Sequence, residues 1–475
     1  MFNKLTSINQ KSVLLFLYIV ILGILAPAIY LITHRSSQIP LGGRVSNNSK
    51  PPLQRRISVG NKILITAKNS LEKQEAVAAF ADGNYVNALD KFENSLKIDP
   101  NDPEARIYLN NTLAAKTKDP YQIAVAVPIG GNLDVAQEIL RGVAQAQDEV
   151  NRSGGINGRL VMIKIANDDN NPEIATEIAQ NLVEDEKVLA VVGHNASNTS
   201  FTVAPIYQNG GLVMVTPTSS AESIPTVGNY IFRTTPSTRD LAQTLAEYAV
   251  EVAGKTNISV CIDSNARAST SFKDNFTWAV YSYGGRITPL DCDLAAADFS
   301  AADIPSQATS QNSDALLLAP SIRKVDEALE VVAANNDRLT LLGNHTLNSY
   351  KTLKQGQKDV KGMVLAVPWY PSQTNSFIEN ARELWGGPVN WRTAMAYDAT
   401  RSIFKAISLG TEREEIQQTL ANPQFSAPGA SSQISFLPTG DRNLRATLIE
   451  IESGKKSGTG FDFQALEPRS LTTSK

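Results

Sequence analysis

From residue 120 onward, short apolar stretches alternate with longer amphipathic segments, and this alternation constrains the fold more than any other feature of the chain. The first amphipathic segment places Ile139, Leu140 and Val143 at helical spacing, whereas the apolar stretches are too short to show that period. Strands are expected at residues 122–128, 160–166, 188–193, 212–216, 258–262, 315–319, 339–343 and 362–367. This pattern predicts an α/β fold in which helices cover both faces of parallel sheets.

The extent of the alternation and the composition narrow the class of protein further. The pattern continues for about 350 residues, more than one such sheet usually carries, so two α/β lobes with doubly wound sheets are predicted. The 44 Lys and Arg residues are balanced by 47 Asp and Glu residues without any basic block, which argues against nucleic-acid binding. Cys261 and Cys292 are too few for a disulfide scaffold and form no Cys/His cluster that could hold zinc.

The amino-terminal region predicts a membrane anchor. Residues 13–32 carry no charge and have about the length needed to cross the hydrocarbon layer as a helix. We therefore expect a short tail at residues 1–12, an uncleaved transmembrane signal anchor at 13–32 and a linker at 33–68. A cleaved signal peptide is the alternative, because the run Ala26-Pro27-Ala28 offers the small residues of a cleavage site. The flanking positive charges do not decide the orientation.

The sequence of residues 69–116 predicts three helices, separated by a turn at Gly83-Asn84 and a break at Asp99-Pro100. They resemble one tetratricopeptide repeat followed by a further helix. The small, aromatic, small and proline positions of that motif are occupied here by Ala88, Phe92, Ser95 and Pro100. Because one and a half repeats cannot bury the core of a solenoid, packing beside the following domain is favoured over a peptide-binding groove.

Hydroxyl and amide side chains follow the third and fourth predicted strands. The residues concerned are Asn195 and Ser197 in the first loop, and Thr218, Ser219 and Ser220 in the second. Ligands bind at the carboxyl ends of the strands in open parallel sheets. Both loops precede helices, whose first N–H groups and dipole favour an anion, so a carboxylate is the expected ligand group. The alternative is that these residues only cap the helices.

A longer series of residues, in fixed order and spacing, identifies the family. The series comprises Gly142, the run Asn151-Arg152-Ser153-Gly154-Gly155-Ile156-Asn157-Gly158, Asn167-Asp168-Asp169 with Pro172, Val192-Gly193-His194 with Ser197, Ala204-Pro205, the run from Gly211 to Pro217, and Phe232-Arg233-Thr234. With these residues, the chain from about 121 to 465 resembles the bacterial periplasmic binding proteins for branched-chain amino acids, which have the type I binding-protein fold.

The resemblance implies a binding domain at residues 120–466, followed by a tail at 467–475. Two lobes joined by three crossovers are expected to close on a ligand like a hinged clamp. Lobe 1 is expected at about residues 121–235 and 367–432, and lobe 2 at about 236–366 and 433–466.

The resemblance implies ligand-binding residues at some of the family's positions, whereas other positions carry different residue types here. The residues that hold the ligand's carboxylate in the family fall here on Ser197, Thr218 and Ser220. The second lobe of the family supplies an aromatic residue and an acid, but those positions fall here on Ala268 and near Pro320-Ser321. Asn195 and Ser219 extend the candidate set, and, judged from position alone, Asp134, Arg267, Asn344, His345, Trp369 and Tyr370 are the candidates to complete it.

Other motifs argue against catalysis and cofactor binding. The glycines at residues 154–158 follow a helix and precede a strand, which is the reverse of the nucleotide-binding order. His34, His194 and His345 have no metal-ligand spacing, and no nucleophile elbow, P-loop or paired-carboxylate motif is present in the sequence. No metal, no cofactor and no enzymatic activity are therefore expected.

The function implied by the resemblance is capture of a small solute, an amino acid or an amide, outside the cytoplasm and its delivery to an ABC-type permease. The alternative is a membrane-tethered sensor in which the same clamp signals through a partner protein. In either case the amino-terminal helix anchors the chain to the membrane, with the binding domain on the periplasmic side. Disulfides form in that compartment, which makes Cys261 and Cys292, on strands linked by one helix, candidates for pairing.

Overall fold

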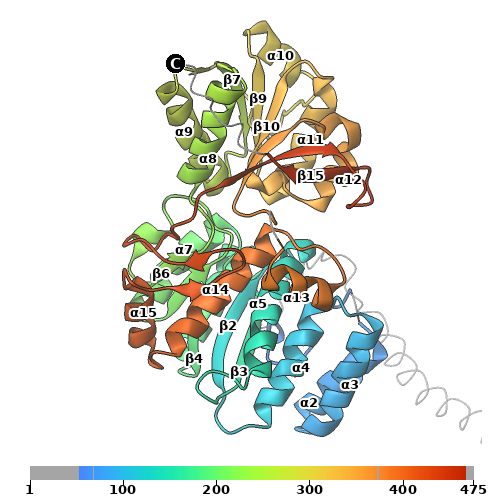
Figure 1. Cartoon of the computed structure of the whole chain (residues 1–475), viewed down its shortest axis with the longest axis vertical. Coiled ribbons are helices and arrows are strands. Elements are labelled where there is room, and N and C mark those ends of the chain that lie inside the picture. The colour runs from blue at the N-terminus through green and yellow to red at the C-terminus, as the bar shows by residue number, and fades with distance from the viewer. Residues whose placement is uncertain (1–52, 68, 372–373, 467–475) are drawn as a thin grey trace, which may run out of the picture. The chain divides into compact units, whose positions relative to one another are not determined.

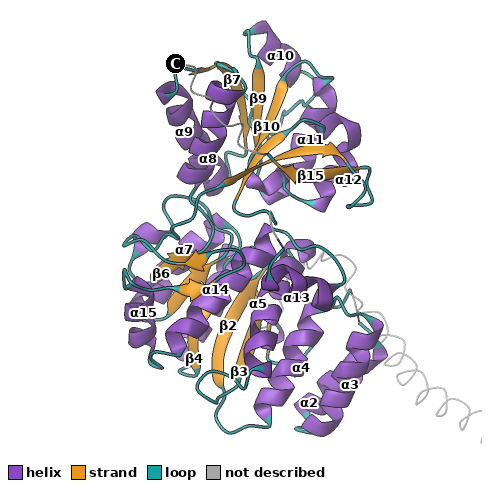
Figure 2. Cartoon of the chain, viewed as in Figure 1, coloured by secondary structure: helices purple, strands orange, loops and turns teal. Residues whose placement is uncertain are grey.

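The computed structural model of the chain describes residues 53–67, 69–371 and 374–466 (Figures 1 and 2). The predicted tail at residues 1–12, the predicted anchor at 13–32 and the predicted carboxyl-terminal tail lie outside the described residues. Within the described ranges, no helix combines the length and the apolar character that a membrane span requires.

The first lobe is built on a six-stranded sheet with the strand order β1-β3-β2-β4-β5-β6. Its strands are β1 (Ile57–Ser58), β2 (Tyr121–Val127), β3 (Val161–Asn167), β4 (Val188–Val192), β5 (Val213–Thr216) and β6 (Ile231–Arg233). All neighbours are parallel except β1, which is antiparallel to β3. Alternate side chains of β2, β4 and β5 enter two separate apolar clusters, so the sheet is buried on both faces.

Helices from distant parts of the chain cover this sheet. One face is covered by α5 (Leu133–Arg152), α14 (Trp391–Ile407) and α15 (Arg413–Ala421), with α13 (Ser376–Trp385) packed against α5. The opposite face is covered by α6 (Pro172–Glu184) and α7 (Ser197–Asn209). The loops between these strands and helices form one edge of the sheet, where the carboxyl ends of the parallel strands meet.

The second lobe has a seven-stranded sheet with the order β15-β14-β11-β10-β9-β7-β8. Its strands are β7 (Asn257–Ile262), β8 (Arg286–Ile287), β9 (Ala315–Ala319), β10 (Thr340–Gly343), β11 (Val364–Val367), β14 (Thr447–Ser453) and β15 (Phe461–Ala465), of which β14 and β15 are antiparallel to their neighbours. The helices α8 (Thr238–Glu247) and α9 (Arg267–Ser282) cover one face, and α10 (Ile304–Ser310), α11 (Val325–Asn335) and α12 (Tyr350–Gly356) cover the other.

The two-lobed α/β fold with doubly wound sheets is confirmed. Every predicted strand is present, with ends that differ by no more than two residues from the expected ones. The chain passes between the lobes after β6, after β11 and before β14.

The last passage lies later in the chain than expected. The sequence predicts that the second lobe resumes at about residue 433, but β13 (Gln433–Ile434) pairs with β12 (Ala427–Pro428) and packs in the first lobe. Further on, the Arg442 N–H donates to the Arg233 carbonyl at 3.1 Å, and the Arg442 guanidinium forms a buried ion pair with Asp398 on α14. The physical reason is that a buried arginine needs this counter-charge, which holds the chain in the first lobe as far as Arg442.

Three helices precede β2 along the chain, namely α2 (Leu71–Ala81), α3 (Tyr85–Ile98) and α4 (Pro103–Ala115). Their amino termini are capped by the side chains of Ser70, Asn84 and Asp102. Helix α4 packs against α5 and β3, and Figure 1 shows the three helices at the side of the first lobe. The predicted helices are thus present and packed beside the binding domain, whereas their relation to tetratricopeptide repeats stays a prediction.

The part of the predicted linker that the structure describes is not a spacer. Strand β1 pairs with β3 in the register Ile57 to Ala166 and Ser58 to Ile165. Further along the same edge of the sheet, the side-chain amide of Asn111 on α4 bonds both the N–H and the carbonyl of Ile163, at 2.8 and 2.7 Å. The side chain of Asn151 does the same for Val161. Together these groups satisfy an edge that would otherwise present unpaired backbone groups.

A buried lysine on α2 forms ion pairs at the start of α4, and one of its partners also binds the segment before α2. Lys73 on α2 is fully buried and forms ion pairs with Asp102 and Glu104, each at 2.7 Å. Glu104 also accepts hydrogen bonds from the Leu64 N–H at 2.7 Å and from the Tyr108 hydroxyl at 3.0 Å. Burial opposes the charge on Lys73, but the two carboxylates outweigh it, and the pKa of Lys73 lies above its ordinary value. The cluster is therefore a charged, fully paired group inside the protein.

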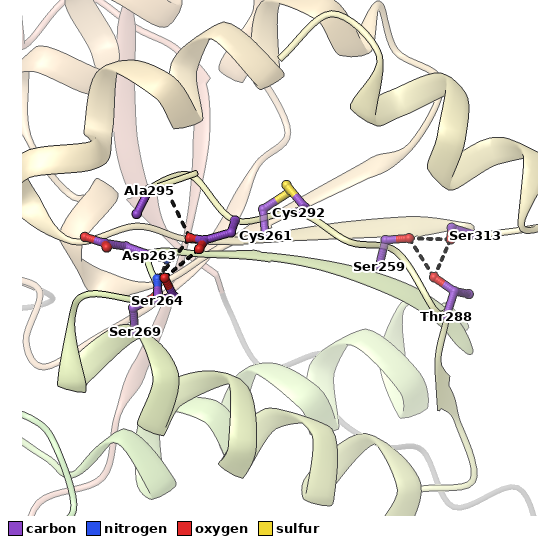
Figure 3. Close-up of a disulfide and its surroundings, with 10 residues drawn as sticks. Ser259, Cys261, Asp263, Ser264, Ser269, Thr288, Cys292, Ala295 and Ser313 are labelled. Atoms are coloured by element: carbon purple, nitrogen blue, oxygen red, sulfur yellow. Dashed lines mark hydrogen bonds between the residues drawn. A yellow bond between two sulfur atoms is a disulfide. The ribbon is translucent and has the colours of Figure 1, made fainter. Parts of the chain in front are cut away.

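A disulfide joins Cys261 on β7 to Cys292 in the loop after β8 (Figure 3). To the right of it in Figure 3, the hydroxyls of Ser259, Thr288 and Ser313 form a closed triangle with distances of 2.6, 2.6 and 2.9 Å. The loop after β8 is therefore attached to β7 by one covalent bond and by buried hydrogen bonds.

Replacing both cysteines with serine is expected to lower the free energy of unfolding by about 2 to 4 kcal/mol, because the bond closes a loop with a sequence separation of 31 residues. Urea denaturation of the oxidised full chain, the reduced full chain and the double variant measures the change. The reduced chain and the variant should agree with each other, and an oxidised chain no more stable than either of them would contradict the expectation.

Candidate ligand-binding site

A cavity of about 210 Å³ lies between the two lobes, and we call it the interlobe cavity. The first lobe contributes Val135, Asn170, Pro172, residues 195–199, Thr218, Trp391 and Arg392, and the second contributes Asp263, Asn265, Ala266, Ala268, residues 320–323, His345 and Thr346. The first-lobe loops follow β3, β4 and β5, and the second-lobe loops follow β7, β9 and β10. The cavity thus lies where the carboxyl ends of both parallel sheets meet, and its size suits a small molecule.

Ser197 is the first residue of α7 and does not cap it. The N-cap position belongs to Ala196, which makes no side-chain capping bond, so the capping alternative fails for Ser197. Its hydroxyl accepts a hydrogen bond from the Ala221 N–H at 3.3 Å. Since residues 195–199 line the cavity, the amino-terminal end of α7, with its first N–H groups and positive dipole end, lies at the cavity.

The hydroxyl-rich loop after β5 has mainly a supporting role. Thr218 lines the cavity and its hydroxyl donates to the Asn195 carbonyl at 2.9 Å. Ser219 contacts the same carbonyl at 3.1 Å and the Ser200 hydroxyl at 2.7 Å, but it does not line the cavity. Ser220 also lies behind the cavity wall, 3.5 Å from Nε2 of His345. These residues therefore fix the loop that carries Asn195 and Ser197.

The wall formed by the second lobe contains a carboxylate that the sequence reasoning missed. Asp263 directly follows β7, is 4% exposed, and lies two residues beyond the disulfide (Figure 3). Its carboxylate accepts a hydrogen bond from the Asn265 N–H at 3.0 Å. Ala268, Pro320 and Ser321 line the same wall, where the family's aromatic residue and acid were expected. Asp263 thus supplies a negative charge close to the expected place but from a different loop.

Three polar groups at the cavity are buried and have no hydrogen-bond partner within residues 53–67, 69–371 and 374–466. They are Nδ1 of His345, Nε1 of Trp391 and the Thr199 hydroxyl. The imidazole of His345 packs edge-on against Trp391, with ring centroids 5.1 Å apart. Burial, and secondarily the Arg392 charge, lower the pKa of His345 to about 3, so this side chain is neutral at pH 7. Buried polar groups are normally paired, so unpaired ones at a cavity indicate a place for ligand atoms.

Several candidate residues lie away from the interlobe cavity. Asn344 is buried, and its amide donates to the Pro320 carbonyl at 3.0 Å, which fixes a neighbouring loop. The Arg267 guanidinium lies over the Phe201 ring, 3.9 Å from its centroid. Asp134 lines a separate hollow of about 270 Å³. Trp369 and Tyr370 line another, of about 520 Å³, where Trp369 donates to Ser431 and Tyr370 donates to the Phe463 carbonyl.

Of the predicted site residues, Asn195, Ser197, Thr218 and His345 are brought together at the cavity. Asp263, Trp391 and Arg392 also line it and were not predicted. Asp263 could have been found from its place directly after a predicted strand. For Trp391 and Arg392 the sequence gives no local signal beyond the start of a helix.

The fold and the interlobe cavity define a two-lobed solute-binding domain. Residues 120–456 match the model of the family described as "Periplasmic binding protein", and the chain belongs to this family. Membership implies a solute-binding domain outside the cytoplasm rather than an enzyme. The match begins after α2, α3 and α4.

Individual relatives agree with this assignment. An amino acid binding protein of Pseudomonas aeruginosa is 30% identical over 145 residues, which cover 30% of this chain and 39% of that protein. A Leu/Ile/Val-binding protein of Rhizobium johnstonii is 23% identical over 350 residues, covering 70% of this chain and 92% of that protein. Matches to the first four curated relatives span 31% to 49% of their lengths.

A solved structure shares the fold. The crystal structure of a leucine binding protein from Thermotoga maritima has a TM-score of 0.64 and 21% sequence identity, and the alignment covers 74% of this chain and 99% of that one.

Proposed function

We propose that the chain is the substrate-binding component of an ABC-type transporter and that it reversibly binds an amino acid or a similar small carboxylate between its lobes. The observation that carries this proposal is the amino terminus of α7, with Ser197, facing the cavity that also contains Asp263. The names of the relatives, which refer to amino acids, support the same class of ligand.

The two ends of an amino acid have matching partners in the two lobes. The α-carboxylate would accept hydrogen bonds from the first N–H groups of α7 and from the Ser197 hydroxyl in the first lobe, while the Thr218 hydroxyl holds the Asn195 carbonyl. The α-ammonium would pair with Asp263 in the second lobe, which replaces the acid expected near residues 320–321. Because each lobe holds one end, the ligand would favour the closed arrangement of the lobes.

The proposal also includes a membrane anchor and a role for the helices that precede the binding domain. The apolar run at residues 13–32 would tether the binding domain to the membrane on its periplasmic side. Helices α2, α3 and α4, which resemble a tetratricopeptide repeat and lie outside the family match, add a surface to the first lobe. That surface is the observation that favours the second candidate, a membrane-tethered sensor that signals through a partner protein. Copurification of a permease with the full chain, or of a signalling protein instead, separates the two functions.

The proposed function is tested by ligand-induced stabilisation of the full chain. A panel of amino acids, amides and simple carboxylates is screened by thermal denaturation. A ligand present at about 1,000 times its dissociation constant should stabilise the folded chain by about 4 kcal/mol. Lack of stabilisation by every member of the panel would overturn the proposal.

Ser197→Ala should weaken binding of the best ligand about tenfold or more, because it removes a charge-assisted hydrogen bond worth roughly 1.5 to 3 kcal/mol. Asp263→Asn should weaken amino acids to a similar extent while leaving their analogues without the amino group unaffected. Titration calorimetry measures both variants. Ser310→Ala on α10 and Asp274→Asn on α9, both exposed, are the matched controls. Wild-type affinity in Ser197→Ala would show that the Ser197 hydroxyl does not hold the carboxylate.

A further inference from the structure

Arg392 is a buried cation at the interlobe cavity that forms no ion pair within the part of the chain that the structure describes. The residue is only 5% exposed and lies in the first turn of α14, where its N–H donates to the side chain of the N-cap residue Asn390. Its guanidinium lies 4.4 Å from the centroid of the Trp391 ring, and Nη1 reaches the Asn348 carbonyl at 3.4 Å. Among the described residues, no carboxylate lies within ion-pairing distance of it.

The acidic residues around Arg392 do not supply the missing charge. Glu138 acts on it electrostatically, but the carboxylate of Glu138 already pairs with Arg141 and accepts a hydrogen bond from Thr393. Asp134, in the adjacent hollow, is exposed to solvent. Burial lowers the pKa of Arg392 to about 10, so the guanidinium remains charged at pH 7. A buried charge without a partner is strongly unfavourable, which indicates that another molecule supplies the counter-charge.

The neighbouring unpaired groups favour the same kind of ligand atom. Nε1 of Trp391 is a hydrogen-bond donor only. In the tautomer of His345 in which the Ser220 hydroxyl donates to Nε2, the proton lies on the unpaired Nδ1, which is then a second donor. Two free donors and one guanidinium at a cavity suit an anionic oxygen group.

We propose that the natural ligand carries a second anionic group, which Arg392 binds inside the interlobe cavity. This inference rests on the proposed function, in which the α-carboxylate lies at α7 and the α-ammonium at Asp263. The ligand is then an amino acid with an acidic side chain. Its net negative charge complements the ionisable residues that line the cavity, where Arg323 and Arg392 outnumber Asp263 and His345 is neutral.

Titration calorimetry on the full chain tests the proposal with L-glutamate, L-aspartate, their amides L-glutamine and L-asparagine, and L-leucine. The wild-type chain should bind at least one acidic amino acid about tenfold or more tightly than its amide. Arg392→Met should remove that preference by weakening the acidic ligand at least about tenfold, while the affinity for the amide changes less than about twofold. Arg392→Lys should retain part of the preference, because lysine keeps the positive charge but lacks the planar guanidinium that can bind a carboxylate through two hydrogen bonds.

The controls separate this proposal from a structural role of Arg392 and from the proposed function. Arg382→Met removes an exposed arginine on α13 and should leave all affinities unchanged. The proposal would be overturned if Arg392→Met lost affinity equally for acidic and neutral ligands. If the methionine variant does not fold, the same criterion applies to Arg392→Lys. Tight binding of L-leucine or an amide with weak binding of both acidic amino acids would overturn it and leave the proposed function intact. Failure of every small carboxylate to bind would overturn both.

Discussion

Replacing Lys73 with methionine is expected to destabilise the folded chain by about 3 to 5 kcal/mol, the usual effect of removing one partner from a buried ion pair. Methionine fills a similar volume, so the loss is electrostatic rather than steric. Without the ammonium group, Asp102 and Glu104 are left as two buried negative charges, both of which pair with Lys73 at 2.7 Å. Because Glu104 also holds the backbone at Leu64, the segment before α2 should loosen as well.

Urea denaturation followed by circular dichroism measures this change in the full chain. Lys91→Met is the matched control, since Lys91 forms a surface ion pair with Glu75 on the same group of helices and should have little effect. Adding Asp102→Asn and Glu104→Gln to Lys73→Met should recover part of the stability by removing the unpaired charges. If Lys73→Met and Lys91→Met behave alike, the buried cluster does not contribute as described.

Gly142→Ala should destabilise the first lobe by about 3 kcal/mol or more, at the upper end for overpacking. A Cβ atom at Gly142 would lie 2.2 Å from the Thr393 carbonyl oxygen and 2.6 Å from the Tyr397 nitrogen, both of them backbone atoms of α14. The two helices would have to move apart, which outweighs the gain of about 1 kcal/mol from the better helix propensity of alanine. Val135 on α5 and Arg392 on α14 both line the cavity, so ligand affinity should fall too.

The control for this change is Gly387→Ala, because a Cβ atom there meets no other atom within 4 Å and the backbone is not left-handed. Thermal denaturation of both variants, followed by titration with the best ligand, gives the two effects separately. A Gly142→Ala chain that melts like the Gly387→Ala chain would mean that α5 and α14 tolerate a wider separation than their packing indicates.

The parts of the fold that sequence reasoning found are those with a strong local signal. The central strands are continuous apolar runs because both of their faces are buried, and the turns between them contain glycine, proline and asparagine. Strand β14 was missed because its outward positions carry Glu450 and Glu452, and its apolar positions are recognisable only once β11 is known to be its neighbour. Strand β1 has only two residues, which is too short for any periodic pattern.

Sequence reasoning found those residues of the candidate site that directly follow a predicted strand. Asn195, Ser197 and Thr218 follow strands that the apolar pattern predicts, so the rule for open parallel sheets places them at the cavity. Trp391 and Arg392 reach the same cavity because the chain returns to the first lobe after β11 and packs α14 on α5. This packing is a property of the tertiary fold, and no local pattern in a single sequence predicts it.

The covering of the β3 edge has a practical consequence for any shortened form of this protein. The family match begins at residue 120, yet β1 and the amide of Asn111, which satisfy that edge, both precede it. A fragment trimmed to the family match would therefore display an unprotected strand, a template onto which a second molecule can add its own strand. The family match therefore does not include every residue that covers this edge, and we expect a fragment for crystallisation or binding assays to stay monomeric only when it begins before β1.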